Sequence, residues 1–212
     1  MTHEHALDPN DHFTREFWDV RYAGDQVWSG NPNPHLVTHA SPLRAGTALE
    51  YGSGEGADAI WLAQQGWQVT AIDISPVALE GADCRAKEAG LDIRWHQADA
   101  FEWTAGPTYD LVSAQFMHLP RPAVTRLHRE LAASVAPGGT LLIVGHHPDD
   151  HRHPAESSDL ADMRFTAEEV AGTLDPADWQ VIEATRPERD SIDRDGRPAV
   201  AVDAVLRAVR RA

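Results

Sequence analysis

The chain has 212 residues, of which 42% are hydrophobic and 24% charged, and this ordinary globular usage supplies enough apolar area for one sizeable core. Such a length predicts one domain and excludes both disorder throughout and two full-size domains. The 33 acids against 18 Lys and Arg give a formal charge of -15, which repels phosphate backbones and anionic lipid headgroups, so we expect neither nucleic acid nor membrane among the partners.

The first ten residues carry His, Glu and Asp without an apolar run, so they do not predict a secretory signal. No segment approaches the roughly 18 apolar residues of a membrane span. Cys84 is the only cysteine, which excludes an intrachain disulfide and a cysteine-based zinc cluster. Together these features favour a cytoplasmic protein.

Residues 1–46, ahead of the first expected strand, are predicted to form a cap segment and not a domain of their own. Asp11–Tyr22 alternates acidic and aromatic residues and indicates a helix, whereas Asn31-Pro32-Asn33-Pro34 indicates a break. Residues 47–212 are predicted to form the main domain.

From Thr47 to Gly145, short apolar runs alternate with helical stretches, which is typical of a parallel sheet with helices on both faces. Ser75 is an expected N-cap, with Pro76 at the first helical position. Strands are expected at Thr47–Tyr51, Trp67–Asp73, Leu91–Gln97, Tyr109–Ala114 and Thr140–Gly145, and helices at about Ala57–Gln65, Pro76–Ala89 and Pro122–Val135, the last ended by the turn Pro137-Gly138-Gly139.

The pattern changes after Gly145, where a polar segment is followed by a capping-box signal and two further apolar runs. The two runs are joined by a charged turn around Asp193–Pro198, and because no helix separates them we expect them to pair antiparallel. The elements expected here are an irregular loop, a short helix and two strands, at His146–Leu160, Ala167–Leu174, Trp179–Thr185 and Val200–Val209.

Three glycines at alternate positions follow the first strand, in Glu50-Tyr51-Gly52-Ser53-Gly54-Glu55-Gly56. Glycine lets the backbone turn tightly and approach a ligand where a Cβ would collide. Gly52, Gly54 and Ala57 also satisfy the G-x-G-x-x-A pattern of dinucleotide folds, so the motif alone leaves open a nucleotide-cofactor oxidoreductase and a turn without a ligand. Asp73 ends the second strand at the same edge, where a carboxylate can accept two hydrogen bonds from a ribose diol.

Two further acids help to separate these candidates. Asp99-Ala100 follows the third strand at the carboxyl edge, where a side-chain oxygen and the adjacent backbone can meet an adenine amino group and ring nitrogen. Glu50 lies just before the glycines, and a carboxylate there repels a pyrophosphate and suits a cationic ligand. The sign of this charge favours a sulfonium cofactor over NAD.

Five segments in order resemble the motifs of the class I S-adenosylmethionine-dependent methyltransferases. They are Ala48–Gly56, with Tyr51 and Ser53 where the family often has Gly or Cys, Val69–Ser75, Gln97–Ala100, Tyr109–Val112 and Leu131–Val144. The resemblance implies an α/β, Rossmann-like three-layer sandwich with a seven-stranded, mostly parallel sheet of order 3-2-1-4-5-7-6, whose last strand is antiparallel. It also implies a methyltransferase activity, with S-adenosylmethionine as the cofactor and S-adenosylhomocysteine as its product.

Phe17–Tyr22, Val27-Trp28 and Pro32-Asn33 resemble the small-molecule branch of that class, which is related to tellurite-resistance and thiopurine methyltransferases. The resemblance implies that the cap closes over the cofactor with Trp18, Tyr22 and Trp28 near its methionine end, although such aromatics can instead pack against the sheet. The cofactor-binding residues expected are Trp28, Glu50, Gly52, Ser53, Gly54, Asp73, Ile74, Asp99, Ala100 and Gln115.

The acceptor is expected to be a small nucleophile, namely a thiol, phenol, amine or metalloid oxyanion, methylated by in-line transfer. His118 follows the fourth strand and His146 the fifth, so each is a candidate general base or a wall residue of the crevice. The loop from His146 to His153 is crowded with imidazoles and carboxylates but lacks a fixed helical ligand pair, so no metal is expected. The alternative functions are an NAD(P)-binding oxidoreductase and a non-catalytic module that binds S-adenosylmethionine.

Overall fold

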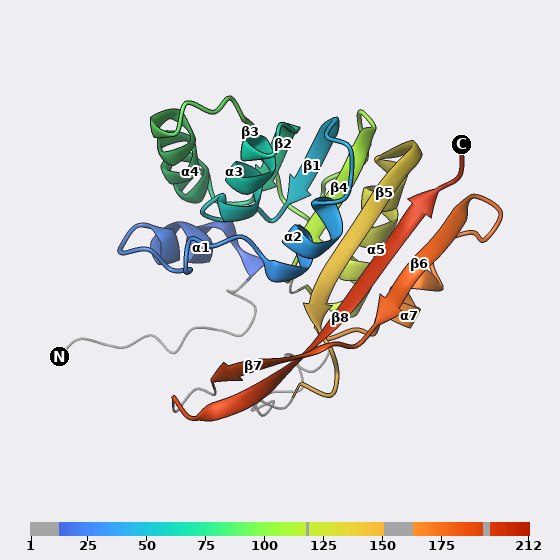
Figure 1. Cartoon of the computed structure of the whole chain (residues 1–212). Helices are drawn as coiled ribbons and strands as arrows, with labels where there is room; N and C mark the ends of the chain where they lie inside the picture. Colours follow the sequence, from blue (N-terminus) through green and yellow to red (C-terminus); the bar gives the residue numbers. More distant parts are fainter. Residues whose placement is uncertain (1–12, 118, 151–162, 193–195) are drawn as a thin grey trace.

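One mixed β-sheet forms the centre of the computed structural model, which describes residues 13–117, 119–150, 163–192 and 196–212 (Figure 1). The strands are β1 (Thr47–Tyr51), β2 (Gln68–Asp73), β3 (Arg94–Gln97), β4 (Tyr109–Gln115), β5 (Val135–His146), β6 (Trp179–Thr185), β7 (Glu188–Ile192) and β8 (Pro198–Arg210). The helices are α1 (Arg15–Tyr22), α2 (Pro34–Ala40), α3 (Ala57–Gln64), α4 (Pro76–Glu88), α5 (Arg121–Ala133) and α7 (Ala167–Ala171).

The order of the strands is β3-β2-β1-β4-β5-β8-β6, in which the first five are parallel and β8 runs antiparallel to both of its neighbours. This confirms the predicted α/β fold and its order, since β8 is the expected seventh strand. The predicted number of strands was wrong, because β7 adds an eighth that pairs with residues 198–202 of β8. Its sequence, Glu-Arg-Asp-Ser-Ile, has no alternation of apolar and polar residues that would have predicted a strand.

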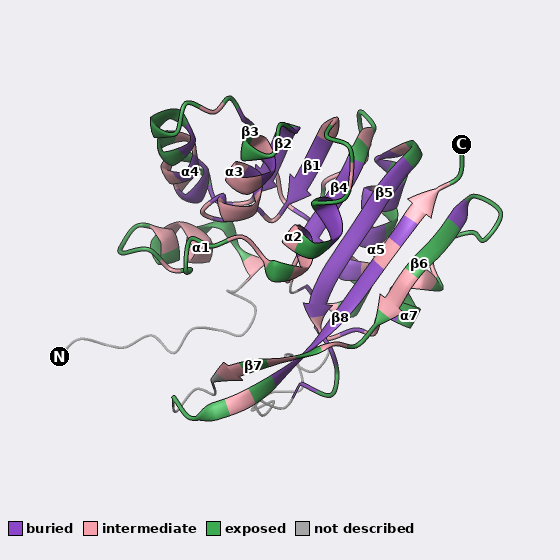
Figure 2. Ribbon diagram, viewed as in Figure 1, coloured by how far each residue is buried: buried purple, intermediate pink, exposed green. Residues whose placement is uncertain are grey.

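Both faces of the sheet are covered, and successive residues of one strand serve different faces (Figure 2). Leu49 and Tyr51 belong to a buried cluster with side chains of α5 and α7, whereas Ala48 belongs to a second cluster with side chains of α2 and α3. Because the central strands are buried on both faces, they are continuous apolar runs in the sequence. Helix α1 lies outside these clusters, against α4.

The cap differs in detail from its prediction. The break at residues 31–34 is also a helix start, because Asn33 accepts a hydrogen bond from the backbone N–H of His35 and Pro34 occupies the first turn of α2. Helix α1 begins only at Arg15, after the N-cap Thr14. Among the helices in the described parts of the chain, none is long and apolar enough to cross a membrane.

The segment that follows α5 also differs from its sequence prediction. The predicted turn Pro137-Gly138-Gly139 lies within β5, which begins at Val135 and not at Thr140. The extra residues fit because the pairing with β4 shifts register between Tyr109 and Leu111. At its other end β5 includes His146, so the loop expected from that residue begins one position later.

Candidate functional site

The glycine-rich bend between β1 and α3 is the centre of the candidate site. Gly52, Gly54 and Gly56 have φ values of 78°, 48° and 81°, a left-handed region that side chains with a Cβ rarely adopt. The backbone N–H groups of Gly52 and Ser53 donate to the carbonyl of Ile72, at 2.8 and 2.9 Å. The bend is therefore fixed to the carboxyl end of the neighbouring strand β2.

Asp73, the last residue of β2, joins the bend to the start of α4. One carboxylate oxygen accepts from the backbone N–H of Gly54 at 2.7 Å, and the other accepts from that of Ser75 at 2.9 Å. Burial raises the pKa of this carboxyl, and the backbone hydrogen bonds oppose that rise. Since a carboxylate oxygen can accept more than one hydrogen bond, each oxygen retains capacity for a ligand hydroxyl.

Two further carboxyl groups lie close to the bend. Glu50 is 1% exposed, and its Oε2 has no hydrogen-bond partner among the residues that the structure describes. Burial, with Asp58 and Asp73 nearby, raises the pKa of Glu50 well above its usual value. Burial also raises the pKa of Asp58 to about 6, although its carboxylate accepts from the backbone N–H of Asn33 at 2.6 Å. Three acids gathered in a buried place favour a cationic ligand.

The substitution Glu50→Gln should show how much the buried carboxyl group lowers the stability of the folded protein. A raised pKa in the folded state means that stability falls as the pH rises from about 4.5, where the unfolded acid titrates, through the folded pKa. The neutral amide avoids that loss. At pH 8 we therefore expect the variant to have a free energy of unfolding roughly 1–3 kcal/mol higher than that of the parent, and a higher melting temperature. At pH 5 the difference from the parent should shrink.

Circular dichroism melts at the two pH values measure this effect, with Glu88→Gln, on the exposed side of α4, as the matched control. A lower melting temperature for Glu50→Gln than for the parent at pH 8 would show that the carboxyl is a stabilising group.

Aromatic residues of the cap lie over the bend. The indole N–H of Trp28 donates to the hydroxyl of Tyr22 at 3.1 Å, and a Cβ added to Gly54 would lie 3.0 Å from that hydroxyl. The Glu55 carboxylate accepts from the backbone N–H groups of Val27 and Trp28, which fastens this part of the cap. Trp18 stacks on Tyr22 with ring centroids 5.7 Å apart. The structure thus brings the three predicted aromatics together beside the bend.

Other predicted residues occupy the ends of β1, β3 and β4. Asp99 accepts from the backbone N–H of Phe101 at 2.8 Å, Ala100 is buried, and Ile74 donates its backbone N–H to Asp73. The amide nitrogen of Gln115 donates to Ser113. Within the described ranges, four buried polar atoms at this edge have no hydrogen-bond partner: Glu50 Oε2, Tyr51 Oη, Ser53 Oγ and Gln115 Oε1. Such orphaned atoms fit a site that is completed by a polar ligand.

Sequence reasoning did not include Asp58 in the site. The roles predicted for His118 and His146 remain predictions. Asp58 carried a usable signal, because an acid in the first turn of the helix after a glycine bend faces the same ligand position. Met117 was expected to face the crevice because it follows the fourth strand, and its sulfur packs where a Cβ on Gly52 would lie. His118 lies outside the described residues, so its role stays a prediction, as does any role of residues 151–153 in the histidine-rich loop. His146 ends β5 at the same edge of the sheet.

Comparison with known proteins finds a methyltransferase match over part of the chain. Residues 48–139 match the family described as "Methyltransferase domain". An uncharacterized methyltransferase of Mycobacterium tuberculosis is 35% identical over 123 residues, which are 57% of this chain and 61% of that protein. The chain spans less than two thirds of the length of the curated relatives it matches.

Two solved structures have the same fold. TehB from Haemophilus influenzae superposes with a TM-score of 0.71 and 18% identity, over 93% of this chain and 67% of that chain. The N-methyltransferase NodS from Bradyrhizobium japonicum, in complex with S-adenosylhomocysteine, superposes with a TM-score of 0.68 and 21% identity, over 94% and 98%.

Residues 48–139 of the chain therefore match a methyltransferase domain, and the chain has the fold of solved methyltransferases. At 18% identity the likeness to TehB concerns the fold alone.

Proposed function

We propose that the protein is an enzyme that transfers a methyl group from S-adenosylmethionine to a small-molecule acceptor. The observation that carries the proposal is the group of acids around the glycine bend of a methyltransferase domain, in which Glu50 and Asp73 are buried and Asp58 is half-buried. Bound there, the cofactor supplies a methyl group on a positively charged sulfur, which leaves as a neutral thioether. A cation lowers the cost of ionising the three acids, so the site and such a ligand are complementary in charge.

The residues at the bend fit the parts of this cofactor. The spare lone pairs of Asp73 suit a ribose diol, and the bend at Gly52–Gly54, with Ser53 Oγ, admits the methionine portion close to the backbone. Asp99 and the backbone near Ala100 and Ile74 suit the adenine, and the Gln115 amide oxygen lies at the same edge. Glu50 suits the ammonium and sulfonium charges.

The cap, residues 1–46 ahead of a main domain at 47–212, would exclude water from this site. Tyr22 and Trp28 cover the bend in the described part of the cap and present aromatic faces, which attract a sulfonium. Methyl transfer discharges a cation, so it gains from a dry site that holds the reacting atoms in line, and positioning of this kind can supply roughly 7–11 kcal/mol.

The alternative acceptors and cofactors fit less well. A pyrophosphate of NAD would lie beside Glu50 and Asp58 and would make ionisation of these acids still less favourable, whereas a cation makes it more favourable. One curated relative, a ribosomal RNA small subunit methyltransferase of Alcanivorax borkumensis, acts on RNA, but the charge of -15 opposes a phosphate backbone. A small acceptor and a cytoplasmic location are the proposals that this charge favours.

Calorimetry of the full chain tests the cofactor. We expect S-adenosylhomocysteine to release or absorb heat with a micromolar dissociation constant, and NADH to give none. Transfer of a labelled methyl group from S-adenosylmethionine, measured over thiols, phenols, amines, tellurite and a transcribed ribosomal RNA fragment, tests the activity. NADH binding in place of S-adenosylhomocysteine would favour the oxidoreductase, and binding without transfer would favour the non-catalytic module.

A further inference from the structure

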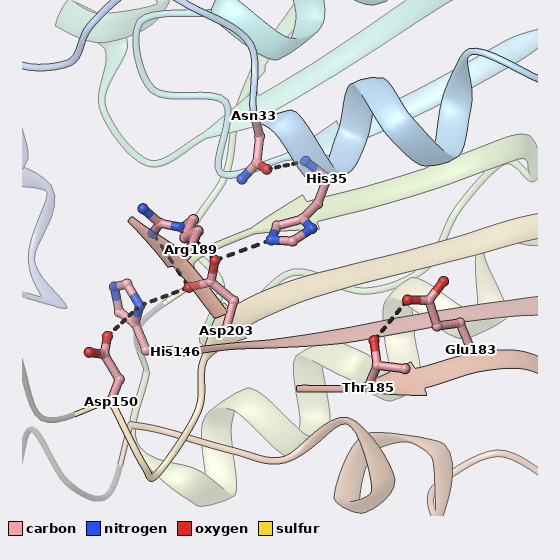
Figure 3. A network of polar contacts seen from close by, with 8 residues as sticks. All are labelled: Asn33, His35, His146, Asp150, Glu183, Thr185, Arg189 and Asp203. Carbon is pink, nitrogen blue, oxygen red and sulfur yellow. Dashed lines mark hydrogen bonds and ion pairs between the residues drawn. The ribbon is translucent and has the colours of Figure 1, made fainter. Parts of the chain in front are cut away.

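A second group of polar side chains lies at the carboxyl edge of β5, beyond the glycine bend (Figure 3). It brings together His35 of α2, His146 of β5, Arg189 of β7 and Asp203 of β8, with Asp150 from the turn after β5. These residues come from five places in the sequence, and the antiparallel pairing of His146 with Asp203 joins them. The cluster holds no residue that the cofactor site uses.

Asp203 is the hub of the cluster. It is 0% exposed, and its carboxylate accepts from His35 Nε2 at 3.1 Å and from Arg189 Nε at 2.6 Å. Burial acts to raise the pKa of Asp203, but hydrogen bonds from His146, His35 and Arg189 hold it well below its usual value. Asp203 is therefore a fixed negative charge over the whole physiological range of pH.

His146 is held in one orientation. Its Nδ1 lies 3.3 Å from Asp150 Oδ2 and 3.7 Å from Asp203 Oδ1, and its ring packs on Phe116 with centroids 4.6 Å apart. Phe116 itself has a φ of 53°, an uncommon backbone conformation for a bulky residue that marks functional sites when the surroundings enforce it. Two carboxylates at Nδ1 favour the proton on that nitrogen, which puts the lone pair of the neutral ring on Nε2.

The cluster is a near neighbour of the glycine bend. Strands β1, β4 and β5 are adjacent, with Tyr51 opposite Ala114 and Gln115 opposite Val144. Two strand spacings separate the end of β1 from the end of β5, which is about 10 Å. The residue after Phe116, Met117, packs against Gly52. An acceptor of one ring would bridge this distance.

We propose that His146 is the general base of the reaction, that Asp150 and Asp203 are its positioning residues, and that the acceptor is a weakly acidic hydroxyl compound of the phenol class. The inference rests on the proposed methyltransferase function. The hydroxyl proton passes to Nε2 of His146 as an oxygen lone pair forms the bond to the methyl carbon; the carbon–sulfur bond breaks with its electron pair left on sulfur, and the imidazolium later gives its proton to water.

The charges around the ring fit this acceptor. Among the residues that the structure describes, the charged and titratable groups that face His146 include Asp150 from the following turn, Asp203 of β8, Arg189 of β7 and, through Asp203, His35 of α2. The two carboxylates stabilise the imidazolium that forms. The Arg189 guanidinium, 6.0 Å from the centroid of the Phe116 ring, repels an ammonium acceptor, whereas a neutral hydroxyl escapes that repulsion. A thiol is more acidic than an ordinary phenol and is the stronger nucleophile once ionised, so it depends less on such a base.

Nitrogen NMR of the histidine rings in the protein without ligands tests the geometry alone. We expect the neutral ring of His146 to carry its proton on Nδ1, and the fraction in that tautomer to fall in Asp150→Asn and in Asp203→Asn, because each substitution removes a carboxylate that faces Nδ1. A proton on Nε2 in the parent, or a tautomer fraction unchanged in both variants, would overturn the assignment.

Rates with acceptors of graded acidity test the role. At pH 8, His146→Gln should slow methylation of phenol by about 10²- to 10⁴-fold, and slow that of 4-nitrophenol and thiophenol, which arrive largely ionised, less than tenfold. His96→Gln, on an exposed position of β3, is the control and should leave all three rates unchanged. Asp150→Asn should slow methylation of phenol and leave the rates with 4-nitrophenol and thiophenol nearly unchanged, because it weakens the hold on His146 and not the cofactor site.

The outcomes distinguish the two proposals. Suppose that S-adenosylhomocysteine binds. If thiophenol is then methylated and no hydroxyl compound is, or if no compound of the panel accepts a methyl group, the assignment of His146 and of the acceptor class fails. The cofactor site stands in both cases. If S-adenosylhomocysteine does not bind, the proposed function itself fails.

Discussion

Gly54→Val is expected to abolish the binding of S-adenosylhomocysteine, with no heat detectable at high micromolar ligand. The φ of 48° at this position is a conformation that a β-branched residue avoids, and an added Cβ would press toward the Tyr22 hydroxyl. The larger side chain would also fill the space through which a ligand approaches the backbone. Calorimetry of the purified variant measures the loss.

The control is Gly90→Val, after the end of α4. Gly90 has a φ of 70° and nothing within 4 Å of an added Cβ, so its substitution introduces comparable backbone strain away from the bend. We expect this variant to lose stability but to bind the ligand with unchanged affinity. Normal binding by Gly54→Val would mean that the ligand occupies another place, and loss of binding in both variants would trace the effect to stability alone.

The second large effect is expected for Asp73→Asn. The amide keeps the shape of the side chain but has one acceptor oxygen in place of two, while the N–H groups of Gly54 and Ser75 still require partners. Loss of charge-assisted hydrogen bonds to a ribose should weaken S-adenosylhomocysteine by about 1–3 kcal/mol, or roughly 5- to 150-fold in dissociation constant.

Asp110→Asn provides the matched comparison, because Asp110 accepts from the backbone N–H of Thr47 at 2.8 Å at the opposite end of β1. Both variants remove a carboxylate that holds the backbone, yet only the one at the bend should change affinity. Equal affinity for Asp73→Asn and the parent would remove Asp73 from the cofactor site.

Much of the fold was predictable because its central strands are buried on both faces. Apolar runs such as those of β1, β2 and β4 stand out from the helices between them, and the two C-terminal strands without an intervening helix indicated antiparallel pairing. The sequence analysis missed elements whose stability depends on pairing or packing with distant parts of the chain. Strand β7 is charged along its length and pairs only because β8 extends past the main sheet, and α2 begins within an Asn-Pro repeat that equally suits a loop.

The candidate site was predictable where local backbone chemistry defines it. The alternate glycines form a tight bend after β1, and Asp73 ends β2 beside it, as the sequence pattern predicted. The charge argument for Glu50 did not predict that this side chain is buried. The cluster around Asp203 was not predicted, since it depends on the register of β8 against β5, and register is a property of the assembled sheet. One signal was available, because Asp203 is a single acid within an apolar strand, and a buried charge needs partners.

Polar contacts fasten the cap to the rest of the protein, and they limit how the cap can be exchanged. Glu55 holds the backbone at Val27 and Trp28, Asp58 holds that at Asn33, and Ser75 donates its hydroxyl to Asp19. The three anchors lie in the bend, in the first turn of α3 and in the turn after β2, so the described part of the cap and the loops of the candidate site form a single exchangeable unit. A chimera that grafts a relative's first 46 residues onto this sheet must carry over positions 55, 58 and 75 as well, or the graft will have nothing to dock on.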